Sequence, residues 1–447
     1  MQWIDTTIGK YCPFIYGKGL PERKRENGDV PVYGSNGIVD YHNESHIKRF
    51  GIIIGRKGSV GAVHLSKIPF WPIDTSFYIE KETIEELYFA YYMLKSLGLE
   101  HMNSDSAVPG LNRDNAHALK IRVPESEDDR KALGAWIATF DKKIATNTQT
   151  NQTLEKIAQT LFKSWFVDFD PVNAKIAVLE SGGGVDEAKL AAMGVIAAKN
   201  LDELAELKQC KPEDYEKLAQ TAALFPSAMQ DSELGEIPDG WEASLVKDVA
   251  DTIKGKSYKS TELDSSSTTL VTLKSFNRGG GYRLDGLKEY TGKYKPEQEV
   301  FAGDLIVAYT DVTQAADVIG KPAMVISDSR YKHLVISLDV AVIRPSNDNL
   351  KYYLYGMAKT EAFQQHTQAH STGTTVLHLS KNAVPGYSFI LASDDLISVY
   401  VEHAQPIFSK INETIEENNS LAAFRDALLP KLLSGEIDLS NTNEATA

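Results

Sequence analysis

Residues 131–165 decide the fold; they read KALGAWIATFDKKIATNTQTNQTLEKIAQTLFKSW. Apolar and small polar residues recur along this stretch at alternating spacings of four and three. This heptad pattern keeps one stripe of a helix facing a partner helix. A helix from Arg130 to Trp165 would span roughly 54 Å, and two asparagines at its midpoint would fix the register of a helix pair at some cost in stability. The stripe comprises Leu133, Ile137, Phe140, Ile144, Asn147, Asn151, Leu154, Ala158, Leu161 and Trp165.

A second stripe with the same spacing lies near the C-terminus. Arg425 interrupts it, and Pro406 is expected to kink or start its helix. We expect the two long helices to pack on each other; the alternative is that each packs separately on its own domain. The second stripe comprises Ala404, Ile407, Ile411, Thr414, Asn418, Leu421, Leu428 and Leu432.

The chain also repeats itself. Trp3–Lys18 aligns without a gap on Trp241–Lys256, so that Gly17 meets Gly255 and Lys18 meets Lys256. The two long stripes align at a constant offset, which pairs Asn151 with Asn418. Such a repeat indicates one structural plan used twice.

Each half begins with a mixed segment of short strands and helices. Apolar runs bounded by turn residues predict strands at 51–55 and 76–79 in the first half, and at 304–308 and 338–343 in the second. Aromatic-rich helices are expected at 87–92 and 350–355. The predicted fold class is α+β, with two pseudo-repeated α/β domains and two long helices. Between the halves, residues 171–235 are expected to form a connector carrying short helices.

Composition fits an ordinary folded protein. The chain has 447 residues, of which 42% are apolar and 24% are charged, a length that suits two or three domains. No run of about 18 apolar residues exists, the first residues do not resemble a secretion signal, and Cys12 and Cys210 are the only cysteines. We therefore expect a cytoplasmic protein.

The net charge of −14 is unevenly spread. Residues 125–235 carry 12 Lys and Arg against 19 Asp and Glu, and residues 391–447 carry 3 against 10. The two mixed segments are close to neutral, and a neutral domain can still present a basic face to DNA.

Signatures of catalysis are missing. Lys254–Ser257 resembles the end of a phosphate-binding loop but lacks its first glycine, and Gly55–Gly61 is not followed by a helix. His42 and His46 have no third ligand in view, so we expect two surface histidines and no metal site. The sequence predicts no catalytic residue and no cofactor in this chain.

Basic, amide and hydroxyl side chains instead gather in stretches expected to be loops. Arg, Lys and Asn bond base edges in the major groove, and Lys and backbone amides bond phosphates. The alternative for any one of them is a solvated loop residue. Candidate DNA-binding residues are Lys18, Arg23, Lys24, Ser35, Asn36, Arg56, Lys57 and Arg113 in the first half, and Lys256, Lys259, Lys274, Asn277, Arg278, Arg283, Thr374 and Thr375 in the second.

Two details of the loops are left open by the residues themselves. The turn Tyr33–Gly37 has no obvious counterpart after Lys256. Thr372–Leu379 occupies the place of Ser106–Leu111, either as a DNA-facing loop or as the turn that leads into the last strand.

Over nearly its whole length the chain resembles the DNA-specificity subunits of type I restriction-modification systems. No single motif decides this, but their order around the repeat is highly specific. The motifs are Val32–Val39, Ile53–Gly61, Trp71–Thr75, Val108–Arg113, Leu161–Pro171, Leu234–Trp241 and Leu428–Ile437.

The resemblance implies two target-recognition domains, each reading one half of a bipartite DNA site, and two helical spacers packed as an antiparallel coiled coil. Because the two halves differ strongly in their middles, we expect an asymmetric target. The expected partners are double-stranded DNA, two adenine methyltransferase subunits docked on the helices, and restriction/translocase subunits. S-adenosylmethionine, ATP and Mg are then expected on those partners, and no membrane is involved.

The implied domains are a first recognition domain (1–124), a helical spacer (125–170), a connector (171–235), a second recognition domain (236–392), a second spacer (393–436) and a tail (437–447). Two other functions remain to be weighed. One is a protein-interaction scaffold without DNA specificity, and the other is a stand-alone DNA-modifying enzyme.

Overall fold

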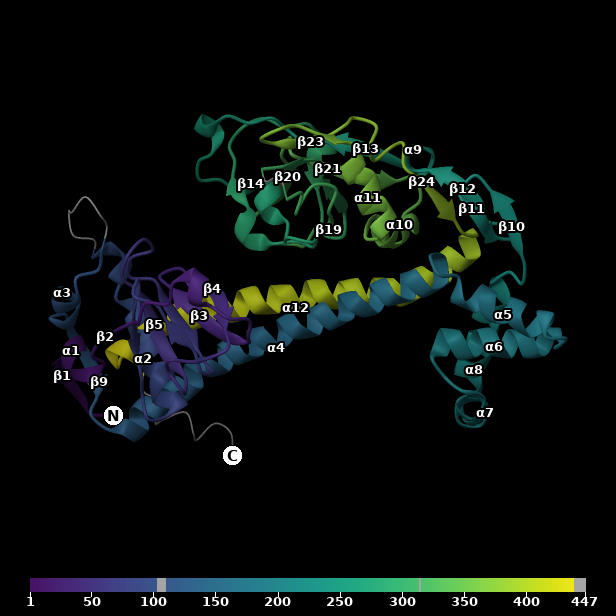
Figure 1. Cartoon of the computed structure of the whole chain (residues 1–447). Helices are drawn as coiled ribbons and strands as arrows, with labels where there is room; N and C mark the ends of the chain where they lie inside the picture. Colours follow the sequence, from purple (N-terminus) through teal and green to yellow (C-terminus); the bar gives the residue numbers. More distant parts are fainter. Residues whose placement is uncertain (103–109, 313–314, 438–447) are drawn as a thin grey trace. The chain divides into compact units, whose positions relative to one another are not determined.

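The structure is a computed structural model that describes residues 1–102, 110–312 and 315–437. The chain forms two compact units. The first unit contains Met1–Asn147 and the chain from Asn418 onward, and the second contains Thr148–Glu417. Each unit combines a sheet-containing domain with parts of both long helices, which confirms the predicted α+β class (Figure 1).

The described residues of the first unit form two small sheets of three or four strands and the two-stranded pair of β1 and β9. A four-stranded sheet runs in the order β2-β8-β5-β6, and a three-stranded sheet runs β4-β3-β7, with β3 and β7 parallel. The strands are β1 Trp3–Thr7, β2 Ile15–Tyr16, β3 Val30–Gly34, β4 Gly37–His42, β5 Gly51–Gly55, β6 Val63–Ser66, β7 Trp71–Pro72, β8 Ser76–Ile79 and β9 Lys120–Pro124, which pairs with β1. The short helices are α1 Ile8–Tyr11, α2 Ile84–Ser96 and α3 Arg113–His117.

The second unit repeats this strand order. Its first sheet runs β13-β21-β17-β19 and its second runs β15-β14-β20-β16, with β14 and β20 parallel. These strands are β13 Ala250–Lys254, β14 Thr268–Val271, β15 Lys288–Glu289, β16 Glu299–Val300, β17 Leu305–Ala308, β19 Pro322–Met324, β20 His333–Ile336 and β21 Val340–Pro345.

The remaining elements of the second unit frame these sheets. The strands β12 Glu242–Leu245 and β24 Ser388–Leu391 pair with each other, as do β10 Met229–Ser232 and β11 Gly235–Pro238. A separate three-stranded sheet consists of β18 Thr310–Asp311, β23 Leu377–Leu379 and β22 Ser371–Thr372. The helices are α9 Val246–Val249, α10 Leu350–Ala358 and α11 Glu361–Ala369.

Backbone packing explains why the repeat keeps Gly17 and Gly255. A Cβ atom on Gly17 would lie 2.1 Å from the carbonyl oxygen of Ile73, and one on Gly255 would lie 2.2 Å from that of Ile336. No side chain fits at either position, because the backbones approach too closely. The following residue, Lys18 or Lys256, donates its backbone N–H to the neighbouring segment at 2.8 and 2.7 Å respectively.

The long helices are α4 Glu127–Phe166 and α12 Asp394–Ser434. They run antiparallel, since Asn147 Nδ2 donates to Asn418 Oδ1 at 2.8 Å in the first unit and Asn151 Nδ2 donates to the Ile411 carbonyl at 3.5 Å in the second. Arg425, which interrupts the stripe, forms an ion pair with Asp141 of α4. The predicted helix pair is confirmed.

None of the fourteen residues assigned to the seam of this pair is exposed. Leu133, Ile137, Asn147 and Thr414 are buried. The others are half-buried, namely Phe140, Ile144, Asn151, Leu154, Leu161, Ile407, Ile411, Asn418, Leu421 and Leu428.

Of the two expectations for Pro406, that it kinks or that it starts the second helix, the structure contradicts the second. Helix α12 begins well before it, at Asp394, and continues through the proline. Pro406 and Glu402, whose carbonyl loses its helical partner, are both exposed. Water can therefore replace the hydrogen bond that the proline removes.

Each long helix ends in the core of one unit. Trp165, near the end of α4, is buried in the second unit, with its ring centroid 5.2 Å from that of Phe225 and 6.3 Å from that of Tyr400. Leu432, near the end of α12, is buried in the core of the first unit. The alignment that pairs Asn151 with Asn418 also pairs Trp165 with Leu432, so the two positions are equivalent in the repeat.

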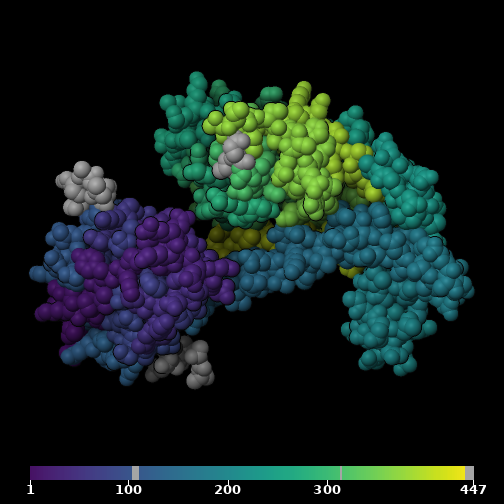
Figure 2. All heavy atoms as spheres, in the orientation of Figure 1, coloured from purple at the N-terminus to yellow at the C-terminus, as the bar shows by residue number. Residues whose placement is uncertain are grey.

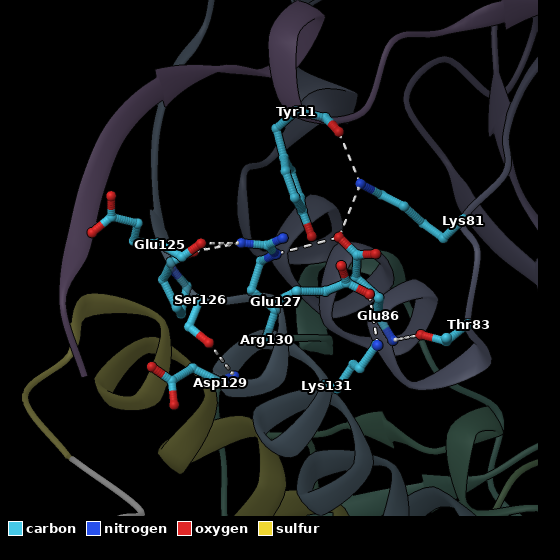
Figure 3. A network of polar contacts seen from close by, with 11 residues as sticks. Tyr11, Lys81, Thr83, Glu86, Glu125, Ser126, Glu127, Asp129, Arg130 and Lys131 are labelled. Carbon is cyan, nitrogen blue, oxygen red and sulfur yellow. Dashed lines mark hydrogen bonds and ion pairs between the residues drawn. The ribbon is translucent and has the colours of Figure 1, made fainter.

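A buried polar network holds the start of α4 against α2 (Figure 3). Arg130 donates to the carbonyls of Pro124 and Glu125, each at 2.8 Å, and to Glu86 Oε1 at 3.3 Å. Lys81 forms an ion pair with the same carboxylate at 3.4 Å and donates to the Tyr11 carbonyl at 2.9 Å. The spacer helix is thus bonded directly to the first sheet-containing domain.

Four short helices follow α4 and form a lobe of the second unit. Figure 2 shows this lobe in teal, projecting from the region where α4 ends. Its own small core contains Ala192, Met193, Leu204 and Ala222. The helices are α5 Asp170–Glu180, α6 Val185–Ala197, α7 Leu201–Cys210 and α8 Pro212–Leu224.

Candidate nucleic-acid interface

One group of predicted residues in the first unit surrounds Tyr16, at the end of β2. Arg56, directly after β5, places its guanidinium carbon 4.9 Å from the centroid of the Tyr16 ring, and Arg113 places its own at 5.0 Å. Arg56 also donates to the Asp74 carbonyl at 3.1 Å. A cation over an aromatic face is held electrostatically, and this contact does not itself use the N–H groups of the guanidinium.

Local structure fixes both arginines from the backbone. Arg56 donates its N–H to the Thr75 carbonyl at 2.9 Å and accepts from the N–H of Leu111 at 2.9 Å. Arg113 is the first residue of α3, whose N-terminus is capped by the Asn112 side chain. Residues far apart in the sequence thereby meet at one point of the surface.

The other predicted residues near the turn Tyr33–Gly37 differ in whether their side chains are available to a ligand. The Ser35 hydroxyl donates to the Thr75 carbonyl at 2.5 Å and accepts from the Lys57 N–H at 3.3 Å, and the residue is buried. Its hydroxyl therefore stabilises the fold. Asn36 and the Lys57 side chain are exposed beside it.

Lys18 lies on the adjoining edge of the same unit. Its ammonium group is 5.6 Å from the Trp71 ring centroid, and Trp71 Nε1 donates to the Lys18 carbonyl at 2.8 Å. Arg23 and Lys24 are exposed in the 3-10 turn η1 Glu22–Lys24, whose backbone hydrogen bonds are made within residues 21–25.

The expectation of two surface histidines is wrong for His42. Its ring is buried, accepts the Glu26 N–H at 3.0 Å through Nδ1, and packs edge-on against Trp71. His46 lies on the same indole, with ring centroids 5.4 Å apart. Both histidines support Trp71. Within the described residues, no group of three or more His, Cys, Asp or Glu side chains could hold a metal ion.

In the second unit, four predicted residues lie in one insertion, residues 272–287, between β14 and β15. Arg278 is largely exposed, with its Nε 3.8 Å from an Asp317 oxygen. Asn277 closes a tight loop by donating its N–H to the Gly281 carbonyl at 2.9 Å, and Gly279, Gly280 and Gly281 all have positive φ. Lys274 is exposed at the start of the insertion.

Arg283 is the least available of these cations. It forms a double hydrogen bond with Asp285, at 2.9 and 2.5 Å. The hydrogen bond from Arg283 holds the pKa of the Asp285 carboxyl below its usual value. Binding a phosphate through Arg283 would first require this pair to open.

This insertion is the counterpart of the turn Tyr33–Gly37, for which the sequence offered none. In the first unit that turn joins β3 to β4, and in the second unit residues 272–287 join the equivalent strands β14 and β15. The equivalence rests on one hydrogen bond: Ile73 donates to the Tyr33 carbonyl, and Ser337 donates to that of Val271, both at 2.9 Å. A long insertion hid the match from sequence alignment.

The remaining predicted residues of the second unit lie outside the insertion. Lys256 is half-buried, its backbone bonded to Ile336 and Leu338, while Lys259 is exposed. Thr374 and Thr375 are exposed in the turn between β22 and β23. That turn leads into β23, which β24 still follows, and its counterpart Ser106–Pro109 lies outside the described residues.

Sequence reasoning missed Tyr16, which organises the first group. The available signal was an aromatic residue directly before the repeated Gly-Lys pair, at a position where the second half has Lys254. Among the described helices, none is both long and apolar enough to cross a membrane.

Comparisons with known proteins agree with this architecture. Residues 3–156 match the family described as Type I restriction modification DNA specificity domain. The chain is 31% identical over 339 residues to the type I restriction enzyme HindI specificity subunit of Haemophilus influenzae, covering 74% of this chain and 71% of that protein. It is 24% identical over 461 residues to the MjaIX specificity subunit of Methanocaldococcus jannaschii, covering 95% and 91%.

A solved structure shares the fold. The S subunit of a type I restriction-modification system from M. genitalium superposes with a TM-score of 0.51 at 15% sequence identity, covering 97% of this chain and 96% of that one.

Proposed function

The chain belongs to the family of type I restriction-modification DNA specificity subunits, and we propose that it reads an asymmetric bipartite DNA target, one half-site with each recognition domain. As a specificity subunit it is the DNA-recognition component of its system and not the catalytic one. The proposal concerns how this particular chain divides the recognition between its halves.

One observation carries the proposal. Both units have the same strand order, β2-β8-β5-β6 and β13-β21-β17-β19, and at equivalent strand ends they carry different loops. The first unit has a tight turn and a pair of arginines on Tyr16, while the second has a glycine-rich insertion with Asn277 and Arg278. One scaffold with two unlike sets of donors suits two unlike half-sites.

Within this proposal the segments have distinct roles. Residues 1–124 and 236–392 recognise DNA, 125–170 and 393–436 form the spacer, 171–235 connect the halves, and 437–447 form a tail. Two adenine methyltransferase subunits dock on the helices, and the restriction/translocase subunits are added for cleavage. Membership of the family implies that these partners bind S-adenosylmethionine, ATP and Mg.

The acidic surface of the helical segments supports this division of roles. Residues 125–235 carry 12 basic against 19 acidic residues, and residues 391–447 carry 3 against 10. DNA repels such a surface, so protein partners suit it better.

The test is a map of methylated adenines across the source genome with the gene present and with it deleted. We expect one bipartite motif with unlike halves to disappear on deletion. An unchanged map calls for a second measurement, selection of DNA from a random pool by the complete complex. A complex that selects no sequence would overturn the proposal in favour of a protein scaffold.

A further inference from the structure

The backbone pairing makes Arg56 and Tyr309 equivalent residues. Arg56 donates its N–H to the Thr75 carbonyl at 2.9 Å, and Tyr309 donates its own to the Asp339 carbonyl at 2.8 Å. The carbonyl of Arg56 accepts from Leu111, and that of Tyr309 accepts from Leu379, both at 2.9 Å. Each residue directly follows the central strand β5 or β17.

Two further pairs follow from the same register. Tyr16 pairs with Phe77 in β8, and Lys254 pairs with Ala341 in β21, so Tyr16 and Lys254 are equivalent. Arg113 lies two residues after Leu111, and Lys381 lies two residues after Leu379. The trio Tyr16, Arg56 and Arg113 therefore corresponds to the trio Lys254, Tyr309 and Lys381.

Each trio contains one tyrosine and two cations, but the positions are exchanged. In the first unit the ring belongs to β2 and the cation follows the central strand. In the second unit the Lys254 ammonium lies 4.5 Å from the centroid of the Tyr309 ring, so that the edge strand supplies the cation and the ring follows the central strand. The cation–aromatic contact is preserved although neither residue is.

The second trio has an unbalanced positive charge. Lys254 lies over the Tyr309 ring, and Lys381 lies two residues after Leu379, which donates its N–H to the Tyr309 carbonyl, so both lysines lie in the surroundings of Tyr309. Partial burial lowers the pKa of Lys254, and the charge of Lys381 lowers it further. Neither lysine forms an ion pair with any residue among 1–102, 110–312 and 315–437. Two like charges held together favour an anion between or above them.

We propose that Lys254 and Lys381 bind the phosphate backbone of DNA at the second half-site, at the place where Arg56 and Arg113 contact DNA at the first. This rests on the proposed function and adds two residues that were not among the candidate DNA-binding residues. Lysine is a compact point charge suited to phosphate, whereas the planar guanidinium forms paired hydrogen bonds with guanine or phosphate. The second trio therefore increases the affinity for DNA of any sequence. In that half, residues of the insertion 272–287 recognise the bases.

The experiment measures DNA binding by the full chain in its complete complex, at several salt concentrations. The DNA is a sequence that the wild-type complex selects from a random pool, and a scrambled sequence is the comparison. The variants are Lys254→Gln, Lys381→Gln and the double variant. Glutamine removes the charge and keeps much of the length of the lysine side chain. The control is Lys217→Gln. It removes the same charge from an exposed lysine of α8, in the lobe.

We expect each single variant to reduce the slope of log affinity against log salt by about one, and the double variant by about two. The loss of affinity should be equal on selected and scrambled DNA, and the control should keep the wild-type slope. Slopes equal to the control would overturn the lysine assignment. A loss confined to selected DNA would overturn the phosphate role.

The same experiment separates this inference from the proposed function. If the wild-type complex selects no sequence, the proposed function itself fails. If the wild type selects a bipartite sequence while the lysine variants behave as the control does, only the assignment of the second trio fails.

Discussion

The two recognition domains share one strand order and differ in almost everything attached to it. Their central strands, β5 and β17, are buried apolar runs, and their parallel pairs, β3·β7 and β14·β20, form the same backbone contacts. Between β3 and β4 the first domain needs only a tight turn, whereas the second inserts residues 272–287. Buried strands constrain sequence through packing, while exposed loops are free to change.

The junctions with the spacer helices differ in a second way. In the first unit Arg130 connects α4 to α2 through Glu86 in a buried polar network (Figure 3). In the alignment that pairs Asn151 with Asn418, its counterpart in α12 is Ile397, a fully buried apolar residue. The same joint is therefore made once by directional hydrogen bonds and once by apolar packing, and the two should respond differently to substitution.

The largest expected effect comes from the ends of the long helices. Trp165→Ala should lower the free energy of unfolding of the second unit by about 3–5 kcal/mol, because a fully buried indole leaves a cavity. The equivalent change in the first unit, Leu432→Ala, should cost about 2–5 kcal/mol there. Hydrogen exchange during denaturant titration assigns each loss to a unit. Loss of protection in residues 1–147 caused by Trp165→Ala would contradict the assignment, and exposed Thr160→Ala is the control.

The junctions are compared by placing methionine at both equivalent positions. Arg130→Met should cost about 2–3 kcal/mol, because it leaves Glu86 buried with Lys81 as its remaining ion-pair partner. Ile397→Met nearly conserves volume and should cost less than about 1.5 kcal/mol. Thermal unfolding measures both. The distinction between polar and apolar junctions fails if the two costs are equal. Adding Glu86→Gln to Arg130→Met should recover part of the loss.

The loops are compared by one substitution in each half. Arg56→Ala should weaken discrimination at the first half-site alone, and Arg278→Ala at the second alone, each by about 1–3 kcal/mol if a base is read by paired hydrogen bonds. Competition binding with DNA altered in one half-site at a time measures this. Equal weakening on scrambled DNA would make the residue a phosphate contact.

The smallest effect concerns pH and is confined to the first unit. Burial, and secondarily Arg113, lowers the pKa of His117, whose Nε2 accepts the Phe14 N–H at 2.8 Å. Because the pKa of His117 is lower in the folded than in the unfolded state, this stability is fully present above the unfolded pKa of about 6.5. It is lost as the pH falls from there through the folded pKa. His117→Gln should therefore lose less stability than the wild type between about pH 7.5 and 5.5. The pairing of Leu111 with Leu379, continued along the chain, aligns His117 with Pro385, which does not titrate. Identical pH profiles for variant and wild type would refute this role of His117.

Local patterns in the sequence were enough to predict the long helices, several strands and the repeat. The heptad spacing from Leu133 to Trp165 specifies a helix with one buried stripe, because helical periodicity depends only on neighbours three and four positions apart. The strands at 51–55 and 76–79 were visible as apolar runs between turn residues, and the repeat of Gly17 and Gly255 reflects a backbone contact in which no side chain fits.

Tertiary structure decided which side chains come together on the surface. Tyr16, Arg56 and Arg113 meet only because the register of β2, β8 and β5 brings segments that are distant in the chain to one edge, and no local pattern encodes that register. Nor does a local pattern show that the Ser35 hydroxyl is already hydrogen-bonded inside the domain. The exchanged roles of Lys254 and Tyr309 likewise appear only when the two sheets are superposed strand by strand. Periodicity is a property of neighbours along the chain, whereas a binding surface is assembled from strand ends that are distant in sequence.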